Sequence, residues 1–354
     1  MRGTTNRVAL ALWVALSVTG CGGSSDPGEP APGGPRPPAD SRVPLMDMGT
    51  GTYLGFQGGL YPDGSNSPPS AHDAEGRARA KLIAPIEGNS SAGGTDRIVL
   101  LSIGMSNTTQ EFCSAGPGTA CASWSFVGQA LADGAVNNAM LEFVDGAAGG
   151  KTAAFWDSPA DPDYDRVRDT RLAPRGLNEE QVQVVWVKVA NPSPTTSLPD
   201  ANADAYRLVT QMGNIARSLK ARYQNVRQVF FSNRIYAGYA TTALNPEPYA
   251  YESGFAVKWV VQAQIDQMRT GAVDPRAGNL DYSGVPWIAW GPDLWANGTT
   301  PRSDGLTYVR ADLESDGTHP SRSGEEKVGR RLLDFFKASP YTSCWFLVAG
   351  NCPG

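Results

Sequence analysis

The chain has 354 residues, a formal net charge of −5 and 18% charged residues. This length suits one large globular domain or two small ones. Phosphate binding needs clustered Lys and Arg, and the sequence has no such cluster, which excludes nucleic acid as a partner.

The N-terminus predicts an export signal. Arg2 and Arg7 form a short basic region, and the apolar stretch over 8–18 that follows is too short to anchor stably in a bilayer. The sequence VTGC, which ends at Cys21, resembles a bacterial lipobox, in which cleavage precedes a cysteine that then carries lipid. An ordinary secretory signal cleaved nearby is the alternative. We therefore expect 1–20 to be a lipoprotein signal peptide and the protein to be lipid-anchored in the bacterial cell envelope.

Residues 21–43 are rich in Pro, Gly and Ser and contain too little apolar surface to fold. We expect this segment, with the lipidated cysteine at its start, to be a disordered tether. The remaining residues, 44–354, should then form the folded domain.

Four cysteines remain if Cys21 carries lipid, and they form two sets with a spacing of eight residues: Cys113 and Cys121, Cys344 and Cys352. An oxidising compartment favours disulfides. Two local loops are the simplest pairing, although four cysteines allow three pairings. Free buried thiols are the alternative.

Apolar runs typical of buried strands recur along the domain, and amphipathic segments separate them. The predicted strands cover 97–103, 139–144, 182–190, 226–232 and 285–290, and the predicted helices cover 123–132, 202–223, 255–268 and 323–336. This alternation indicates an α/β fold with a mainly parallel sheet covered on both faces. Ligands of such sheets bind beyond the carboxyl ends of the strands.

Only two histidines, His72 and His319, are available as a general base near neutral pH. His319 follows Asp316 by three positions across an Asp-Gly turn, so the carboxylate can reach back to one ring nitrogen. A solvated turn beside a surface histidine is the alternative. His72 lies in a polar stretch, and we expect it to be a surface loop residue.

Ser106 comes directly after the first strong strand, within IGMSN. A serine at a strand-to-helix turn presents its hydroxyl above the sheet edge, with backbone N–H groups beside it. A helix-capping serine is the alternative. Together, a serine after the first strand and an Asp-x-x-His before the last helix are more specific than either motif alone.

This arrangement resembles the SGNH (GDSL-like) hydrolase family over about residues 97–337, as a divergent, carbohydrate-esterase-like branch. The resemblance implies a three-layer, flavodoxin-like fold with a five-stranded, mainly parallel sheet. It implies Ser106, His319 and Asp316 as catalytic residues, with Ser106, Gly149 and Asn191 forming the oxyanion hole. The sequence departs from the family at Met105, where the family has the Asp of Gly-Asp-Ser. It departs again around Asn191, where Val189 and Pro192 replace the outer residues of Gly-x-Asn-Asp.

The resemblance implies a serine esterase that acts through an acyl-serine intermediate, here on a short acyl group such as acetyl carried by a carbohydrate or related alcohol. Trp156, just past the glycine-rich loop, and Tyr236, just past the fourth strand, are expected to contact the substrate. The alternatives are a non-catalytic glycan- or protein-binding surface lipoprotein and an acyltransferase, which would use the same residues.

No metal or organic cofactor is expected. Residues 145–152 nearly match a P-loop, but Asp145 replaces its first glycine, so we expect a tight loop that serves the esterase site. Asp161, Asp163 and Asp165 alternate as in a calcium loop, but Arg166 stands where the glycine belongs, which favours a solvated acidic loop. Two distant histidines cannot make a three-histidine zinc site.

Overall fold

The computed structural model describes residues 42–88, 95–116, 119–350 and 352. The predicted signal peptide, the lipidation site at Cys21 and nearly all of the tether lie outside these residues. Within them, no helix combines the length and the apolar character that a bilayer crossing requires.

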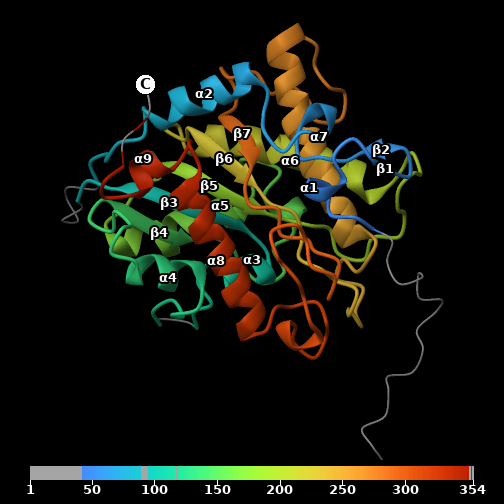
Figure 1. Ribbon diagram of the computed structural model, residues 1–354. Coiled ribbons are helices and arrows are strands. Elements are labelled where there is room, and N and C mark those ends of the chain that lie inside the picture. The colour runs from blue at the N-terminus through green and yellow to red at the C-terminus, as the bar shows by residue number, and fades with distance from the viewer. Residues whose placement is uncertain (1–41, 89–94, 117–118, 351, 353–354) are drawn as a thin grey trace, which may run out of the picture. The chain divides into compact units, whose positions relative to one another are not determined.

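A five-stranded sheet organises the domain (Figure 1). Its strands are β3 (Ile98–Gly104), β4 (Leu141–Asp145), β5 (Val182–Lys188), β6 (Gln228–Phe231) and β7 (Trp287–Trp290). They lie in the order β4-β3-β5-β6-β7, and every neighbouring pair is parallel. This is the flavodoxin-like order, in which the direction of winding reverses between β3 and β5 and ligands bind at the carboxyl ends there. The predicted fold class is confirmed.

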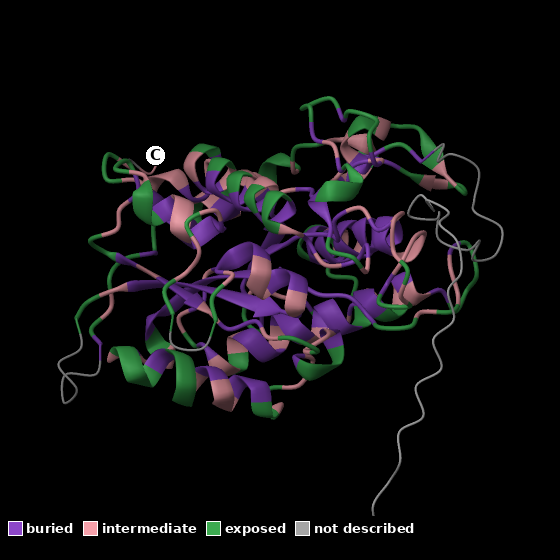
Figure 2. Cartoon of the chain, turned by 90° about the horizontal axis from the view of Figure 1, so that it is seen from below, coloured by how far each residue is buried: buried purple, intermediate pink, exposed green. Residues whose placement is uncertain are grey.

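Helices cover both faces of the sheet (Figure 1). The helices α3 (Ser106–Phe112), α4 (Phe126–Ala132) and α8 (Arg322–Ala338) share one hydrophobic cluster, and α6 (Asp204–Arg222) and α7 (Tyr249–Thr270) share the other. Strand side chains alternate between the two clusters: Leu101 and Ile103 face α6 and α7, whereas Leu100 faces the α8 side. Because both faces are covered, four of the strands are buried at every position and only the edge strand β4 has partly exposed residues, as the mostly purple sheet in Figure 2 shows.

Shorter elements precede, interrupt and follow the main helices and strands in the chain. They are α1 (Leu45–Met48), the hairpin β1 (Thr52–Tyr53) and β2 (Phe56–Gln57), α2 (Ser70–Ala80), α5 (Pro162–Val167) and α9 (Ser343–Phe346). Helix α7 begins earlier than the sequence predicted. Gly254 interrupts the apolar periodicity of its first turns in the sequence, and in the structure it allows Leu45 to pack closely. The predicted local disulfides, Cys113–Cys121 and Cys344–Cys352, are both present.

His72 is a buried residue of α2, so the expectation of a surface loop histidine is wrong. Its Nε2 lies 3.0 Å from the carbonyl oxygen of Ile288, and its Nδ1 lies 3.3 Å from the hydroxyl of Tyr282. A carbonyl only accepts, so Nε2 carries the proton of a neutral ring. Burial lowers the pKa of His72 to about 4, although the bond to Ile288 acts to raise it.

We expect this histidine to make the fold sensitive to mild acid. The pKa of His72 is lower in the folded state than in the unfolded chain, so its contribution is complete above about pH 6.5 and is lost as the pH falls towards 4. The loss should reach roughly 3 kcal/mol. Urea unfolding of wild type and His72→Gln between pH 4 and 8 tests this. Parallel pH profiles of the two proteins would contradict it, because other groups contribute equally to both.

Candidate active site

Ser106 lies at the carboxyl edge of the sheet, beside the point where the strand order reverses. Strand β3 ends at Gly104, and α3 begins two residues later with Ser106 in its first turn. Gly104 has a φ of 155°, and a Cβ there would lie 2.2 Å from the carbonyl oxygen of Lys188. Only glycine fits at this close approach, so it permits the sharp turn that presents the Ser106 hydroxyl.

Asp316 and His319 lie on one tight turn just before α8. Oδ1 of Asp316 accepts the backbone N–H groups of Thr318 (2.9 Å) and His319 (3.0 Å), and Oδ2 accepts Nδ1–H of His319 at 2.5 Å. Gly317 has a φ of 63°, and a Cβ there would lie 1.9 Å from the carbonyl oxygen of Tyr239. The Asp-Gly turn therefore aims the carboxylate at the ring.

The structure brings Ser106, His319 and Asp316 together. Nε2 of His319 lies 2.7 Å from Oγ of Ser106. Because Nδ1 keeps its proton and donates it in a hydrogen bond to Asp316, Nε2 is left as the acceptor for the serine hydroxyl. Burial acts to raise the pKa of Asp316, but hydrogen bonds from the backbone and ring of His319 and from Thr318 outweigh it, and the pKa lies below its usual value. The His319 side chain is 24% exposed, so a substrate can reach it.

The predicted oxyanion loop runs beside the Ser106 turn. The N–H of Ala148 donates to the carbonyl oxygen of Gly104 (3.2 Å), which places the next residue, Gly149, close to the end of β3. Gly149 is exposed, and among the described residues its N–H has no hydrogen-bond partner. The N–H groups of Gly149 and of Ser106, in the first turn of α3, are therefore free to donate.

Asn191, the third predicted member of the oxyanion hole, is tied to the start of α6. It is 1% exposed, and its Nδ2 donates to Oδ1 of Asp204 (3.0 Å) at the start of α6. Its Oδ1 has no partner among the described residues. The amide nitrogen carries a second hydrogen besides the one donated to Asp204, so the oxyanion role of Asn191 stays a prediction. The asparagine after the third strand therefore holds α6 in place, which the sequence did not indicate.

Of the two aromatic residues expected at the substrate site, one is in the core. Trp156 is fully buried, donates to the carbonyl oxygen of Lys151 (3.1 Å) and packs edge-on against Tyr164. The prediction that Trp156 contacts the substrate is therefore wrong. Tyr236 is half-buried and packs against Tyr239, whose backbone contacts the Asp316 turn. Tyr236 thus stays a candidate.

A run of polar side chains on α3 ties this helix to its neighbours, which the sequence did not predict. Nδ2 of Asn107 donates to the carbonyl oxygen of Thr318 (2.9 Å). The hydroxyl of Thr108 donates to the carbonyl oxygen of Lys188 (2.7 Å). The hydroxyl of Thr109 donates to Asp145. The sequence NTTQE is typical of an exposed helix start. These contacts could not be predicted from it, because they form only when the helix packs against the edge of the sheet.

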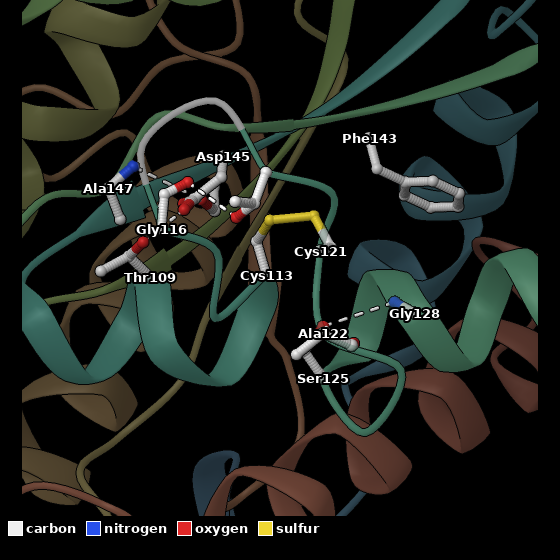
Figure 3. The surroundings of a disulfide bond; sticks show 12 residues. Thr109, Cys113, Gly116, Cys121, Ala122, Ser125, Gly128, Phe143, Asp145 and Ala147 are labelled. Carbon is white, nitrogen blue, oxygen red and sulfur yellow. Dashed lines mark hydrogen bonds between the residues drawn. A yellow bond between two sulfur atoms is a disulfide. The ribbon is translucent and has the colours of Figure 1, made fainter. Parts of the chain in front are cut away.

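Figure 3 shows Thr109 and Asp145 beside the Cys113–Cys121 disulfide, which closes the loop after α3. Asp145 also accepts from the hydroxyl of Ser102 (2.6 Å), and burial raises the pKa of Asp145 in spite of these two bonds. The glycine-rich loop after Asp145 leads into a short 3₁₀ turn, Ala153–Phe155, and not into the long helix that a P-loop requires.

Glu111 of α3 and Lys188 at the end of β5 form an ion pair with no exposed side-chain surface. Burial lowers the pKa of Lys188 to about 8, against the attraction of Glu111. Arg234 is also buried, and burial lowers its pKa. The nearby carboxylates of Glu111, Glu247 and Asp316 act to raise it. The carboxyl edge of the sheet therefore holds a buried charge cluster of Glu111, Lys188 and Arg234.

The acidic run after the loop is neutralised by basic side chains. Asp163 accepts from Arg166 (2.7 Å) and pairs with Lys151 (3.0 Å), and Asp165 pairs with Arg168. Across residues 42–88, 95–116, 119–350 and 352, no group of three or more His, Cys, Asp or Glu side chains has the arrangement of a metal site.

The fold is thus a flavodoxin-like α/β fold, and its site has the Ser-His-Asp geometry of a serine hydrolase. No family model and no curated protein matches the sequence. Similar solved structures include an extracellular lipase from Streptomyces rimosus (13% identity, 67% of this chain and 98% of that chain, TM-score 0.34). A family two carbohydrate esterase from Cellvibrio japonicus is also similar (11% identity, 69% and 64%, TM-score 0.36).

Proposed function

We propose that this protein is a serine esterase of the SGNH type that hydrolyses a carboxylic ester. The observation that carries the proposal is the continuous chain of contacts from Ser106 Oγ to His319 Nε2 (2.7 Å) and from His319 Nδ1 to Asp316 Oδ2 (2.5 Å). A partly exposed serine in this setting has a base to accept its proton and a carboxylate to stabilise the resulting imidazolium.

In the proposed reaction, Ser106 Oγ attacks the ester carbonyl while His319 Nε2 takes its proton. The tetrahedral oxyanion accepts hydrogen bonds from the backbone N–H groups of Ser106 and Gly149. The imidazolium then protonates the leaving alcohol and the acyl-serine forms. Water, deprotonated by His319, attacks this acyl-serine. The bond between the acyl carbon and Ser106 Oγ then breaks, the imidazolium returns the proton to Oγ, and the acid is released.

We further propose that the acyl group is short, such as acetyl, and that a carbohydrate or related alcohol carries it. Support comes from Tyr236 and Tyr239, half-buried rings on the segment that contacts the Asp316 turn, since aromatic faces suit the C–H faces of sugars. The sequence also supports lipid attachment at Cys21, which would hold the domain on a bacterial membrane.

A series of p-nitrophenyl esters and acetylated sugars tests this function. The proposal predicts hydrolysis of acetyl esters at a higher kcat/KM than of long acyl esters, and release of acetate from acetylated sugars. Faster turnover of long acyl esters would contradict the short-acyl proposal but not the esterase. A protein that is inert on every ester would favour the alternative, a glycan- or protein-binding lipoprotein.

A further inference from the structure

One buried hydrogen bond joins the nucleophile helix to the segment of the base. Nδ2 of Asn107, the residue after Ser106, donates to the carbonyl oxygen of Thr318, the residue before His319, at 2.9 Å. Asn107 is 2% exposed, and the two residues that this bond joins are 211 positions apart in the sequence. Among the described residues, the only other hydrogen bond between α3 and residues 316–320 is the Ser106–His319 contact itself.

The peptide group between Thr318 and His319 is held on both sides. Its carbonyl oxygen accepts from Asn107, and its N–H donates to Oδ1 of Asp316 (3.0 Å). A peptide group is planar, so two hydrogen bonds on opposite sides fix the orientation of the whole plane. The Cα of His319 belongs to that plane, and the position of the ring follows from it.

We propose that Asn107 is a positioning residue that sets the distance between Ser106 Oγ and His319 Nε2 through the Thr318–His319 peptide. This proposal rests on the proposed esterase function. The Ser106–His319 hydrogen bond alone is made by two rotatable side chains, whereas the Asn107 bond ties the two backbones together one residue away from each reacting group. Asn107 touches no substrate in this scheme and acts only through His319.

The position requires a short side chain with a donor. In Asn107→Asp the amide becomes a carboxylate oxygen that faces the Thr318 carbonyl oxygen, and two acceptors repel. In Asn107→Ala the bond is lost without a new charge. We expect both variants to lower kcat for p-nitrophenyl acetate about 10²-fold, the cost of a displacement near 1 Å, with KM unchanged. The rate of labelling by a fluorophosphonate should fall by the same factor.

The pH profile separates positioning from a merely structural effect. The new carboxylate of Asn107→Asp lies near His319 and should move the acidic limb of kcat/KM to higher pH, because a negative charge favours the imidazolium. Asn107→Ala should lose the same factor in kcat without that shift. Gln228→Glu is the matched control. Gln228 is the first residue of β6, and its buried side-chain amide donates to the carbonyl oxygens of Gly76 and Tyr341. It should lower the Tm without changing kcat.

The possible results distinguish the two proposals. Wild type that neither hydrolyses nor labels overturns the esterase and the role of Asn107 with it. An active wild type with an equally active Asn107→Ala overturns only the role of Asn107. The positioning role is also overturned if kcat in Asn107→Ala and in Gln228→Glu falls in the same proportion to the loss of Tm, because that pattern belongs to general destabilisation.

Discussion

Replacing Ser106 with alanine should lower kcat/KM for p-nitrophenyl acetate by about 10³-fold or more, and His319→Ala should have an effect of similar size. Ser106 supplies the attacking oxygen, and His319 is the only base within hydrogen-bond distance of that oxygen among the described residues. Nucleophile and base act as a unit, so the double variant should be no worse than either single variant. Steady-state rates of the four proteins measure this.

Ser283→Ala is the matched control, because Ser283 is an exposed serine on the loop before β7 and should leave the rate unchanged. Circular dichroism of each variant checks that the fold is retained. An additive loss in the double variant would contradict the account, since it would mean that the two side chains contribute to separate steps.

Glu111→Gln should lower the free energy of unfolding by about 3–5 kcal/mol, and Lys188→Met should cost less than Glu111→Gln. Removing the carboxylate leaves Arg234 as a buried cation and takes away the attraction that helps to keep the buried Lys188 protonated. Removing Lys188 instead leaves Glu111 beside Arg234, so part of the charge stays compensated. Because a domain has about 5–15 kcal/mol of stability in total, the larger of these losses is severe.

Urea unfolding at pH 7 measures both variants. Arg168→Met is the control, since it removes exposed ion pairs with Asp165 and Asp169 and should leave the free energy of unfolding almost unchanged. If Lys188→Met proves more damaging than Glu111→Gln, the assignment of Arg234 to the same charge cluster is wrong.

The fold could be predicted because strand and helix signals repeat and agree with one another. The run at 98–104 is apolar except at Ser102 because the strand is covered on both faces, and the long amphipathic face of α6 is equally clear. Helix α2 was missed because its buried positions are His72, Gly76 and Ala80, which carry little apolar signal. Its packing depends on small side chains beneath Trp287, a contact that no local pattern contains.

The candidate triad could be predicted because each part lies on a local motif, a serine after a strand and an Asp-x-x-His turn. The side-chain roles around it could not, since they depend on which atoms the fold leaves unpaired. Asn191 has the expected residue type in the expected place, but one of its two amide hydrogens is donated to Asp204. Trp156 is just past the expected loop, but its ring turns into the core. Asn107 was overlooked because its acceptor is a backbone carbonyl far along the chain.

Mapping the site of fluorophosphonate attachment tests the central claim most directly. The purified protein is incubated with a fluorophosphonate, digested, and its peptides are analysed by mass spectrometry, with Ser106→Ala and a heat-denatured sample in parallel. The account predicts one modified peptide, with the adduct on Ser106, which is absent from the variant and from the denatured protein. An adduct on another residue of the native protein, or none at all, would contradict the claim that Ser106 is an activated nucleophile.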